Sequence, residues 1–435
     1  MSNADPIVVV TGADDDFALP MAVTLYSTLV NLERGRSVAL YIMDGGISDR
    51  NRRRLIQTLK APDIRAQITW LTPDLMRLED LPVAGWLAPA TYLRLFIPDL
   101  LPSDCDRALY LDSDLVVEGD VGHLWEQDLR DVRAYGVPNY SSPIVAWKRE
   151  AVSMFRSFGL SPETPFCNAG VLLLNLKRWR EEQLAQQALD LARRFALPES
   201  DQDAINIAVA GQWGVLDARW NVQLSAIQRY GRFLTSSLSL SEQDAAQACA
   251  ALQERAYILH FTSVNKPWRF ACQQPSRTRF FHYLRQTHWF GDVQDEDELM
   301  ERTFSEQPGF ESWMSKVASA EKDLAALIPP GGHFIFVDEA TWPVGTVARW
   351  RTVPFLERDG QYWGLPSDDA TAILEFERLR KTGVTHLVFA WPAFWWLEQY
   401  SGWRTHLHLH FARILNNERV IVFDLHRQPT DYLEQ

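Results

Sequence analysis

The stretch Ile7–Phe17, which reads IVVVTGADDDF, carries the first information about the fold. Its first part, Ile7 to Thr11, is short, apolar and β-branched, as is typical of a strand buried on both faces. A glycine and three aspartates end this run, and Ala18 to Leu32 then shows helical spacing. The chain is therefore expected to open with a βα unit.

The same alternation continues through the first two thirds of the chain. Further strands are expected at Val38 to Met43, Gln67 to Leu71, Arg107 to Leu111, Ala134 to Val137 and Ala169 to Asn175. Helices are expected at Ser48 to Leu59, Thr91 to Ile97, Leu176 to Phe195 and Gln202 to Ala210. The polar stretch Ser236 to Gln247 is interpreted as an exposed loop or helix before a short strand, Ala256 to Phe261. This pattern predicts an α/β fold with a mixed, mainly parallel sheet.

The sequence changes character beyond Phe290, where an acidic run is followed by the break Pro329 to Gly332. We expect a catalytic domain at 5–290, a linker or helical connection at 291–330 and a small α/β domain at 331–428. The elements expected in the last part are strands at His333 to Val337, Thr385 to Trp391 and Arg419 to Leu425, and helices at Asp368 to Thr382 and Trp395 to Leu415.

The composition is that of an ordinary globular protein. The 435 residues are 46% hydrophobic and 23% charged, and the formal net charge of -13 argues against nucleic acid as a partner. An anionic small substrate stays possible where a metal ion or a basic cluster makes the local electrostatic potential positive. Neither an export signal nor a transmembrane segment is apparent, so the cytoplasm is the expected location. The scattered residues Cys105, Cys167, Cys249 and Cys272 are interpreted as reduced thiols.

Two aspartates follow a predicted buried strand in the middle of the chain. Asp112 and Asp114 stand directly after Arg107 to Leu111. In an open α/β sheet, ligands gather at the carboxyl ends of strands. Paired carboxylates there can hold a divalent cation through oxygen ligands, with room left for diphosphate oxygens. A turn with two solvated aspartates is the other interpretation of this pattern.

A second pair of candidates lies at and after the strand that ends near His260. A neutral imidazole can complete a Mn²⁺ site that two carboxylates begin, and Lys266 can neutralise charge on a leaving phosphate. Taken alone, a histidine at a strand end is more often structural, and a lone lysine more often lies in solvent. The combination with Asp112 and Asp114 is what favours a metal and phosphate site.

Six motifs, in this order, resemble those of glycosyltransferase family 8. These GT-A type retaining transferases include bacterial lipopolysaccharide galactosyltransferases and, more distantly, glycogenin. The motifs are Gly12 to Phe17 (GADDDF), Thr91 to Leu95 (TYLRL), Tyr110 to Asp114 (YLDSD), Phe166 to Asn175 (FCNAGVLLLN), Asp201 to Asp203 (DQD) and His260 to Trp268 (HFTSVNKPW). The resemblance covers about Ile7 to Phe290 and implies a Rossmann-like GT-A catalytic domain, followed here by the small α/β domain.

The resemblance implies a UDP-sugar as donor and Mn²⁺, or alternatively Mg²⁺, as cofactor. It assigns the metal to Asp112, Asp114 and His260. The nucleotide would be contacted by Ala13, Asp14, Asp15, Asp16, Phe17, Asp112, Ser113, Ser263 and Lys266, with the uracil at Ala13, Asp14 and the Asp15 to Phe17 turn and the ribose nearby. The donor sugar would be contacted by Arg94, Asn168, Ala169, Gly170, Asp201 and Gln202. Ser263 replaces a glycine usual in the family, and its side chain is expected to reduce affinity or shift the loop.

The charge that develops in the reaction determines the expected mechanism. Breaking the anomeric bond leaves negative charge on the β-phosphate, which Mn²⁺ and Lys266 would stabilise. Double displacement needs a nucleophile, and the matching residue, Gln202, has a neutral amide. We therefore expect front-face attack by the acceptor hydroxyl, with Asp201 as the alternative nucleophile. The expected activity is retaining transfer of glucose or galactose to a saccharide or protein acceptor.

Two other function classes stay open at the level of the sequence. A sugar nucleotidyltransferase also uses strand-end aspartates, but it needs a glycine-rich, basic loop where this chain has Asp14 to Asp16. A noncatalytic carbohydrate- or partner-binding protein that retains the fold is the other alternative, and it would release no UDP.

Smaller signals lie in the C-terminal part. His406 and His410 form half of a zinc site if helical, with His408 between them, but no third ligand is evident. The aromatic residues Trp391, Trp395, Trp396, Tyr400 and Trp403 are interpreted as packing residues rather than a sugar platform. Asp368 and Asp369 are expected to cap a helix. This domain is expected to bind acceptor, dock a partner protein or join copies into a homo-oligomer, and its residues do not choose among these.

Overall fold

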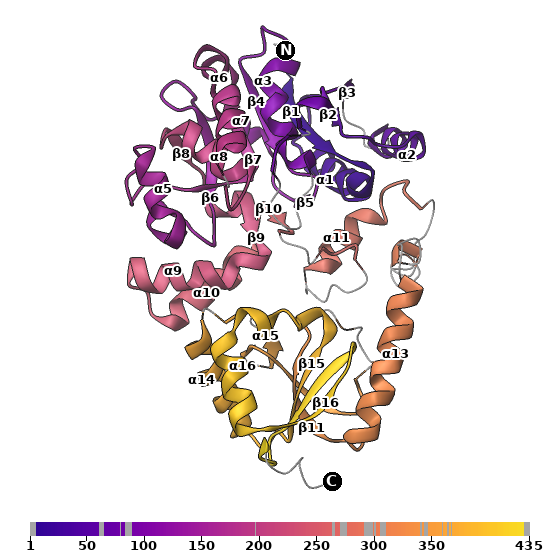
Figure 1. Cartoon of the computed structure of the whole chain (residues 1–435). Helices are drawn as coiled ribbons and strands as arrows, with labels where there is room; N and C mark the ends of the chain where they lie inside the picture. The colour runs from indigo at the N-terminus through magenta and orange to yellow at the C-terminus, as the bar shows by residue number, and fades with distance from the viewer. Residues whose placement is uncertain are drawn as a thin grey trace. The chain divides into compact units, whose positions relative to one another are not determined.

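The computed structural model describes residues 6–60, 65–78, 80–82, 89–195, 197–262, 266–269, 276–290, 299, 302–304, 310–339, 342, 347–358, 360–362, 365–366 and 368–429 (Figure 1). Contacts within the chain divide it into two units. The first comprises Met1–Val264 and Arg279–Glu296, and the second comprises Asn265–Thr278 and Asp297–Gln435. The limits expected from the sequence, 5–290, 291–330 and 331–428, stay predictions.

A seven-stranded sheet with the order β3-β2-β1-β4-β7-β6-β8 forms the centre of the first unit. Within this sheet only β7 runs against its neighbours. The strands are β1 (Ile7–Ala13), β2 (Ser37–Asp44), β3 (Arg65–Leu71), β4 (Arg107–Leu111), β6 (Ala134–Pro138), β7 (Cys167–Asn175) and β8 (Trp213–Val215). The predicted mixed, mainly parallel sheet is confirmed, although β8 is too short for its pattern to be recognised in the sequence.

A second, three-stranded sheet continues from the end of β4. It has the order β5-β10-β9 and consists of β5 (Leu115–Val117), β10 (Ile258–His260) and β9 (Val222–Gln223). The β10 strand pairs antiparallel with β5, so that His260 lies opposite Leu115. This pairing brings the end of the predicted strand Ala256 to Phe261 to the end of β4.

Hydroxyl side chains on one face of helix α1 (Ala18–Val30) form hydrogen bonds with backbone groups at the free edge of β5. The Thr24 hydroxyl donates to the Leu115 carbonyl at 2.9 Å, and the Ser27 hydroxyl accepts from the Val117 amide at 3.0 Å. Because these polar groups recur at helical spacing and are buried, they replace the strand partner that the edge lacks. The β5 strand is thereby fixed where it leaves the aspartate pair.

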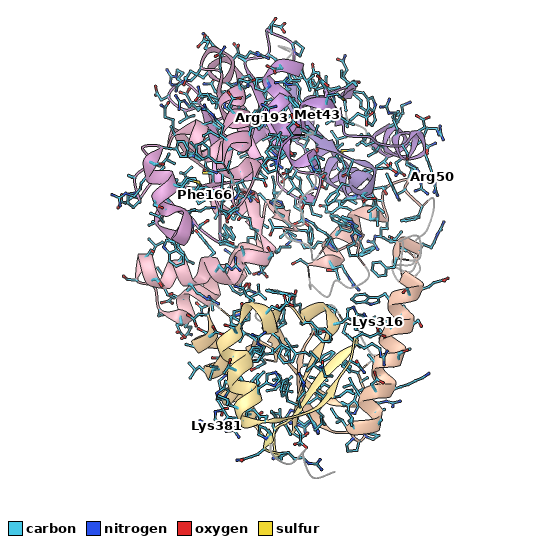
Figure 2. All side chains as sticks on the ribbon, in the orientation of Figure 1. Met43, Arg50, Phe166, Arg193, Lys316 and Lys381 are labelled. Atoms are coloured by element: carbon cyan, nitrogen blue, oxygen red, sulfur yellow. The ribbon has the colours of Figure 1, made fainter. Side chains whose placement is uncertain are left out.

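A hydrophobic core of the first unit is built from apolar residues of strands, helices and loops. It includes Met43, Tyr92, Phe166 and Trp179, each at most 1% exposed. Figure 2 labels the buried residues Met43 and Phe166 of this core, and it also labels Arg193 of the same unit, which is exposed. The helices of the first unit include α2 (Asp49–Lys60), α4 (Gly122–Trp125), α5 (Val152–Ser157), α8 (Asp201–Val209), α9 (Ile227–Leu238) and α10 (Glu242–Glu254).

Two helix predictions in the first unit are wrong in detail. The helix expected at Leu176 to Phe195 is two helices, α6 (Leu176–Glu181) and α7 (Leu184–Arg194), because Gln183 takes a left-handed conformation with φ 53°. The helix expected at Thr91 to Ile97 is the 3-10 helix η3 (Pro89–Phe96), followed by α3 (Ile97–Leu100). Local backbone breaks of this kind leave the apolar spacing unchanged, so the sequence pattern does not reveal them.

The second unit has its own sheet, with the order β12-β11-β15-β17-β16. The parallel strands are β12 (Arg351–Pro354), β11 (His333–Val337) and β15 (His386–Ala390), and the antiparallel ones are β17 (Val420–Asp424) and β16 (Ala412–Asn416). A hairpin of β13 (Glu357–Arg358) and β14 (Gln361–Tyr362) is separate. Helices α13 (Phe310–Leu327), α14 (Asp369–Arg380), α15 (Trp396–Gln399) and α16 (Ser401–His410) complete this part. The α/β character expected of the C-terminal part is confirmed.

The helix expected at Trp395 to Leu415 is wrong at its end, because the chain leaves α16 at His410 and forms the strand β16. The expected cap is present, since the Asp368 carboxylate accepts from the Thr371 amide at 2.8 Å. Trp396 and Trp403 are fully buried, which confirms packing for these two, whereas Trp395 is 39% exposed.

In the part of the chain that the structure describes, no helix is both long and apolar enough to span a membrane.

Candidate functional site

The site begins where the apolar strand β4 ends. Its last residue, Leu111, is fully buried, and Asp112, Ser113 and Asp114 then connect β4 to β5. The Asp112 amide donates to the Gly170 carbonyl at 2.8 Å, so this connection stays tied to β7. The Asp112 side chain is 19% exposed and that of Asp114 is 10% exposed. The two carboxylates are thus shielded but reachable.

The imidazole of His260 faces this carboxylate pair. Its Nε2 atom lies 3.2 Å from Asp114 Oδ1 and 3.7 Å from Asp112 Oδ2. Ladder pairing positions the ring, because the Phe261 amide continues the β5–β10 register by donating to the Asp114 carbonyl at 3.1 Å. One ligand atom from each of the three residues lies within 4.8 Å of the others. The residues expected to hold the metal therefore converge.

Gly170 on β7 leaves the space that this cluster occupies. A Cβ atom built on Gly170 would lie 2.3 Å from His260 Cε1 and 2.7 Å from Asp112 Oδ2. Contacts this short do not occur between real atoms, so any side chain would displace the imidazole or the carboxylate. The glycine of the Asn-Ala-Gly sequence is therefore required by the packing around the candidate metal ligands.

Arg94 connects the carboxylate pair to a third buried acid. Its guanidinium lies 3.0 Å from Asp112 Oδ1 and 3.1 Å from Asp201 Oδ2, and it donates to the Ala169 carbonyl at 2.6 Å. Although burial alone would lower the pKa of Arg94, the carboxylates of Asp112 and Asp201 raise it above its ordinary value. The guanidinium is thus held as a cation among acids.

Asp201 is almost fully enclosed, with 3% of its surface exposed. Burial raises the pKa of its carboxyl group, and the Arg94 cation and the Thr91 hydroxyl act against that rise. The Thr91 hydroxyl donates to Asp201 Oδ1 at 2.6 Å. One oxygen of Asp201 is therefore hydrogen-bonded within the protein, and the other is ion-paired with Arg94 but receives no hydrogen bond from the described residues.

A chain of side-chain amides leads from His260 to the expected donor-sugar residues. Asn221 Oδ1 lies 2.9 Å from His260 Nδ1, and Asn221 Nδ2 donates to Asn168 Oδ1 at 2.8 Å. Asn168 Nδ2 donates in turn to Gln202 Oε1 at 2.9 Å, and Gln202 Nε2 donates to Glu199. The expected residues Asn168 and Gln202 thus belong to one network with a metal-ligand candidate.

The acidic turn after β1 is well ordered by its own hydrogen bonds. Ala13 is the buried last residue of β1, and the Asp14 carboxylate accepts from the Phe17 amide at 3.2 Å. Burial raises the pKa of Asp14. Partial burial also acts to raise the pKa of Asp15, but hydrogen bonds from Ser48 and Asn51 outweigh it and lower the value. A uracil or ribose role for this turn stays a prediction.

Two of the residues expected at the diphosphate are Ser263 and Lys266. Ser263 lies outside the described residues. Lys266 is 7% exposed in the second unit, with its Nζ atom 5.9 Å from the centroid of the Trp268 ring. Its role toward a phosphate stays a prediction.

The donor set of Asp112, Asp114 and His260 fits a divalent cation. Two carboxylates and one imidazole suit Mn²⁺, since this metal accepts both oxygen and nitrogen ligands. The second ring nitrogen of His260 contacts Asn221, as the ring nitrogen that does not bind metal commonly contacts an acceptor in metal sites. The structure thus brings together a buried Asp-Asp-His group with the chemistry of a metal site.

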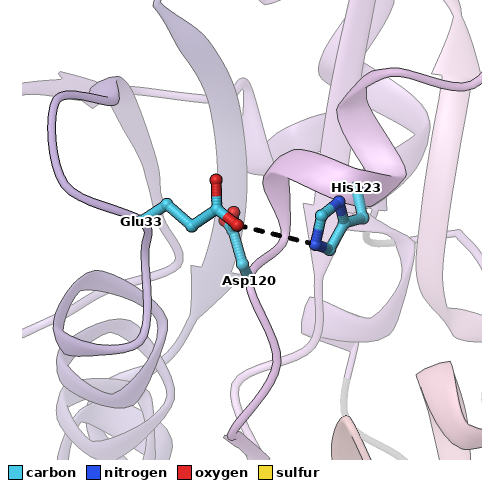
Figure 3. Close-up of side chains that lie close together, drawn as sticks. All are labelled: Glu33, Asp120 and His123. Atoms are coloured by element: carbon cyan, nitrogen blue, oxygen red, sulfur yellow. Dashed lines mark ion pairs between the residues drawn. The ribbon is translucent and has the colours of Figure 1, made fainter.

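Glu33, Asp120 and His123 form a second group of possible ligands in the first unit (Figure 3). Glu33 Oε1 lies 3.9 Å from His123 Nε2, and both side chains are more than half exposed. Arg36 Nε lies 2.9 Å from Asp120 Oδ2, so a guanidinium already compensates the charge that would attract a cation. We assign no metal here.

Sequence reasoning missed three residues that shape the site. Asn221 orients His260, Tyr110 donates to Asp112 Oδ1 at 2.7 Å, and Glu199 accepts from Gln202. Tyr110 stands beside the aspartates, and its hydroxyl could have been proposed as a partner. Asn221 ends the 3-10 helix η5 (Ala218–Asn221) and Glu199 lies in a turn, and neither belongs to a recognisable motif, so only the folded chain reveals their contacts.

Comparison with known proteins places the first unit among glycosyltransferases. The chain is 27% identical over 286 residues to General stress protein A of Bacillus subtilis, covering 65% of this chain and 94% of that protein. It is 24% identical over 294 residues to the lipopolysaccharide 1,2-glucosyltransferase of Escherichia coli, with coverage of 67% and 81%. It is also 24% identical over 299 residues to the lipopolysaccharide 1,3-galactosyltransferase of Salmonella typhimurium, with coverage of 66% and 80%.

A solved structure supports the same fold. The galactosyltransferase LgtC, solved with donor and acceptor sugar analogues, superposes with a TM-score of 0.53 at 21% identity, covering 68% of this chain and all of that chain. The expected GT-A architecture is thereby confirmed. Residues 8–272, more than half of the chain, match the sequence family described as Glycosyl transferase family 8. The chain belongs to glycosyl transferase family 8.

Proposed function

We propose that this protein is a retaining hexosyltransferase that moves glucose or galactose from a UDP-sugar to an acceptor hydroxyl. The observation that carries the proposal is the convergence of Asp112, Asp114 and His260 at the carboxyl end of β4, in a family whose members typically use a divalent metal and a nucleotide sugar. Relatives named as glucosyl- and galactosyltransferases support a hexose donor.

Asp112, Asp114 and His260 would hold the metal, with Mn²⁺ preferred and Mg²⁺ as the alternative. When bound, the cation would supply positive charge next to the diphosphate and stabilise it as a leaving group. Arg94 holds Asp112 in place through its 3.0 Å contact, so the carboxylate is positioned before the metal arrives. Lys266 is proposed as a further cation for the diphosphate.

We propose front-face attack rather than double displacement. In this reaction the bond between the anomeric carbon and the phosphate oxygen breaks, the acceptor oxygen bonds to the same face, and its proton passes to the departing phosphate. Gln202 is unsuited to act as a nucleophile, because its Oε1 accepts from Asn168 Nδ2 at 2.9 Å and from the Ala169 amide at 3.0 Å. Its oxygen lone pairs are therefore engaged.

The alternative nucleophile, Asp201, is disfavoured for a similar reason. Its Oδ1 accepts from Thr91, and its Oδ2 pairs with Arg94. Attack on the sugar would require one of these contacts to break in a site that excludes water. We therefore assign Asp201 and Gln202 to holding the donor-sugar subsite in shape.

The proposed donor contacts follow from the placement of the remaining residues. The turn from Asp14 to Phe17 is assigned to the uridine, and Arg94 with the Asn168–Gly170 segment is assigned to the hexose. The acidic turn also disfavours a sugar nucleotidyltransferase, which would need a basic loop to hold a triphosphate. A noncatalytic binding protein is the remaining alternative.

Release of UDP from UDP-glucose and UDP-galactose tests the proposal. We expect release with Mn²⁺, none with EDTA, and a loss of at least about 100-fold in Asp114→Asn, because one metal ligand is weakened. Glu33→Gln is the matched control, since it alters the second acidic group and should leave the rate unchanged. A noncatalytic protein would release no UDP from either donor, and equal rates with Mn²⁺ and EDTA would contradict the metal.

A further inference from the structure

The sheet of the second unit has a switch point between β11 and β15. From β11 the chain moves to β12 on one side, and it then returns to β15 on the other side of β11. All three strands are parallel, so their carboxyl ends share one edge. In open α/β sheets this is the place where ligands bind, outside the strand ends at which the order reverses. The described residues next to these ends are therefore candidates for a second binding site.

Glu339 stands at this edge, two residues after β11. Its backbone has φ 55°, a left-handed conformation that glutamate seldom adopts and that recurs at binding sites. Its Oε1 accepts from the indole nitrogens of Trp395 at 2.5 Å and Trp396 at 2.6 Å. Because both tryptophans follow β15, this carboxylate joins the two strand ends across the switch point.

The Glu339 carboxylate retains capacity for a ligand. Among the residues that the structure describes, no hydrogen bond reaches its Oε2 and no lysine or arginine pairs with it. Partly buried acids often pair with a cation, whereas Glu339 is held by two neutral indole groups. One oxygen is therefore available to accept a hydrogen bond from a ligand, and its charge disfavours phosphates.

Trp395 provides an apolar surface beside this oxygen. It is 39% exposed and is the only exposed tryptophan in the described part of the chain, whereas its neighbour Trp396 is fully buried. Because the Trp395 indole N–H is already bound to Glu339, the ring is fixed and its remaining exposure is largely apolar. A flat apolar surface beside a hydrogen-bond acceptor matches a sugar ring, which has C–H groups on its face and hydroxyls at its edge.

We propose that the carboxyl edge of β11 and β15 binds a neutral saccharide, which stacks on Trp395 and donates a hydroxyl hydrogen bond to Glu339. The site lies in the unit that does not contain Asp112, Asp114 and His260. A cationic amine is the competing ligand class, since carboxylates and aromatic rings also bind quaternary ammonium groups. One exposed indole face does not enclose a cation, and Glu339 already receives two N–H donors, so the saccharide is favoured.

An array of neutral oligosaccharides ending in glucose, galactose, mannose or N-acetylhexosamine, probed with the full chain, tests this proposal. EDTA is present and UDP-sugar is absent, so the result does not depend on donor cleavage and a failure here leaves the proposed transferase activity untouched. We expect binding that Trp395→Ala weakens by about tenfold or more, through loss of stacking. Trp395→Phe, which keeps an aromatic face, should retain most of the binding, and Glu339→Gln should weaken it.

Leu374→Ala is the matched control, because Leu374 is 69% exposed in the same unit and lies on α14. Near-UV circular dichroism establishes that each variant is folded. The absence of binding to any oligosaccharide, equal binding by Trp395→Ala and the unchanged chain, or equal losses in Trp395→Phe and Trp395→Ala would each overturn the proposal. Binding of millimolar tetramethylammonium with no binding of any glycan would overturn it in favour of a cation site.

Discussion

His260 Nδ1 lies 2.9 Å from Asn221 Oδ1, and a backbone amide fixes the direction of this hydrogen bond. The Gly170 amide can only donate, and it donates to Asn168 Oδ1 at 3.0 Å. The Asn221 group that faces the same oxygen must then be its Nδ2, which leaves Asn221 Oδ1 toward the imidazole. His260 Nδ1 therefore carries a proton, and Nε2 is the ring nitrogen that would offer its lone pair to a metal ion held by Asp112 and Asp114.

Asn221→Leu should weaken Mn²⁺ binding about 10- to 100-fold, because nothing would then hold the His260 ring in this tautomer and orientation. Asn221→Asp keeps an acceptor for Nδ1–H and should retain most of the affinity. Mn²⁺ binding in the absence of UDP-sugar, measured by electron paramagnetic resonance of free Mn²⁺, should distinguish the two variants. Equal affinities in Asn221→Leu and the unchanged chain would contradict the orienting role.

Arg94→Met should destabilise the fold by about 3–5 kcal/mol, because it leaves the buried Asp201 and the partly buried Asp112 without their shared cation. The replacement keeps much of the volume, so the effect reports on charge rather than on a cavity. Urea unfolding provides the measurement. The control is Arg130→Met, since Arg130 is exposed and should be replaceable without effect. A loss below about 1 kcal/mol for Arg94→Met would be incompatible with the proposed charge balance.

Gly170→Ala should abolish Mn²⁺ binding while the protein still folds, because the new methyl group would displace His260 or Asp112. Titration calorimetry with Mn²⁺ measures the loss. Gly231→Ala is a suitable control, since its Cβ would meet only Cys249 Sγ at 3.3 Å and alanine favours the helix α9. Retained metal affinity in Gly170→Ala would show that the three ligands do not converge as described.

The stability of the unchanged chain relative to Glu339→Gln should fall as the pH rises above about 4.5. Burial raises the pKa of Glu339, and the indole hydrogen bonds only partly offset it. The folded state therefore binds the proton more tightly than the unfolded state, and the resulting stability is lost as the pH rises through the raised pKa. Urea unfolding of both proteins between pH 4 and pH 8 checks the sign. A relative gain in stability with rising pH would show that the pKa is lowered instead.

The sequence was sufficient to predict the strands of the large sheet that contain five or more residues. Runs such as Ala108 to Leu111 are apolar over their whole length, and burial on both faces requires that pattern. The strands β5 and β9 were missed, because two or three residues offer too few positions for a pattern to appear, whereas the equally short β10 lies within the longer predicted run Ala256 to Phe261. The break at Gln183 was also unpredictable, because it depends on one backbone angle.

The candidate site was predictable to the extent that its residues lie in motifs. Asp112, Asp114 and His260 were proposed from strand ends and resemblance, and the structure brings them together. The amide chain through Asn221 could not be predicted, since its members are separated by more than 30 residues and carry no charge pattern. Hydrogen bonds between distant amides are specified by the folded backbone rather than by local sequence.

Anomalous X-ray diffraction from crystals grown with Mn²⁺ and UDP tests the central claim most directly. The account predicts one strong manganese peak within bonding distance of Asp112, Asp114 and the Nε2 atom of His260. The absence of a peak between these side chains, or a peak bound instead by Glu33, Asp120 and His123, would contradict it.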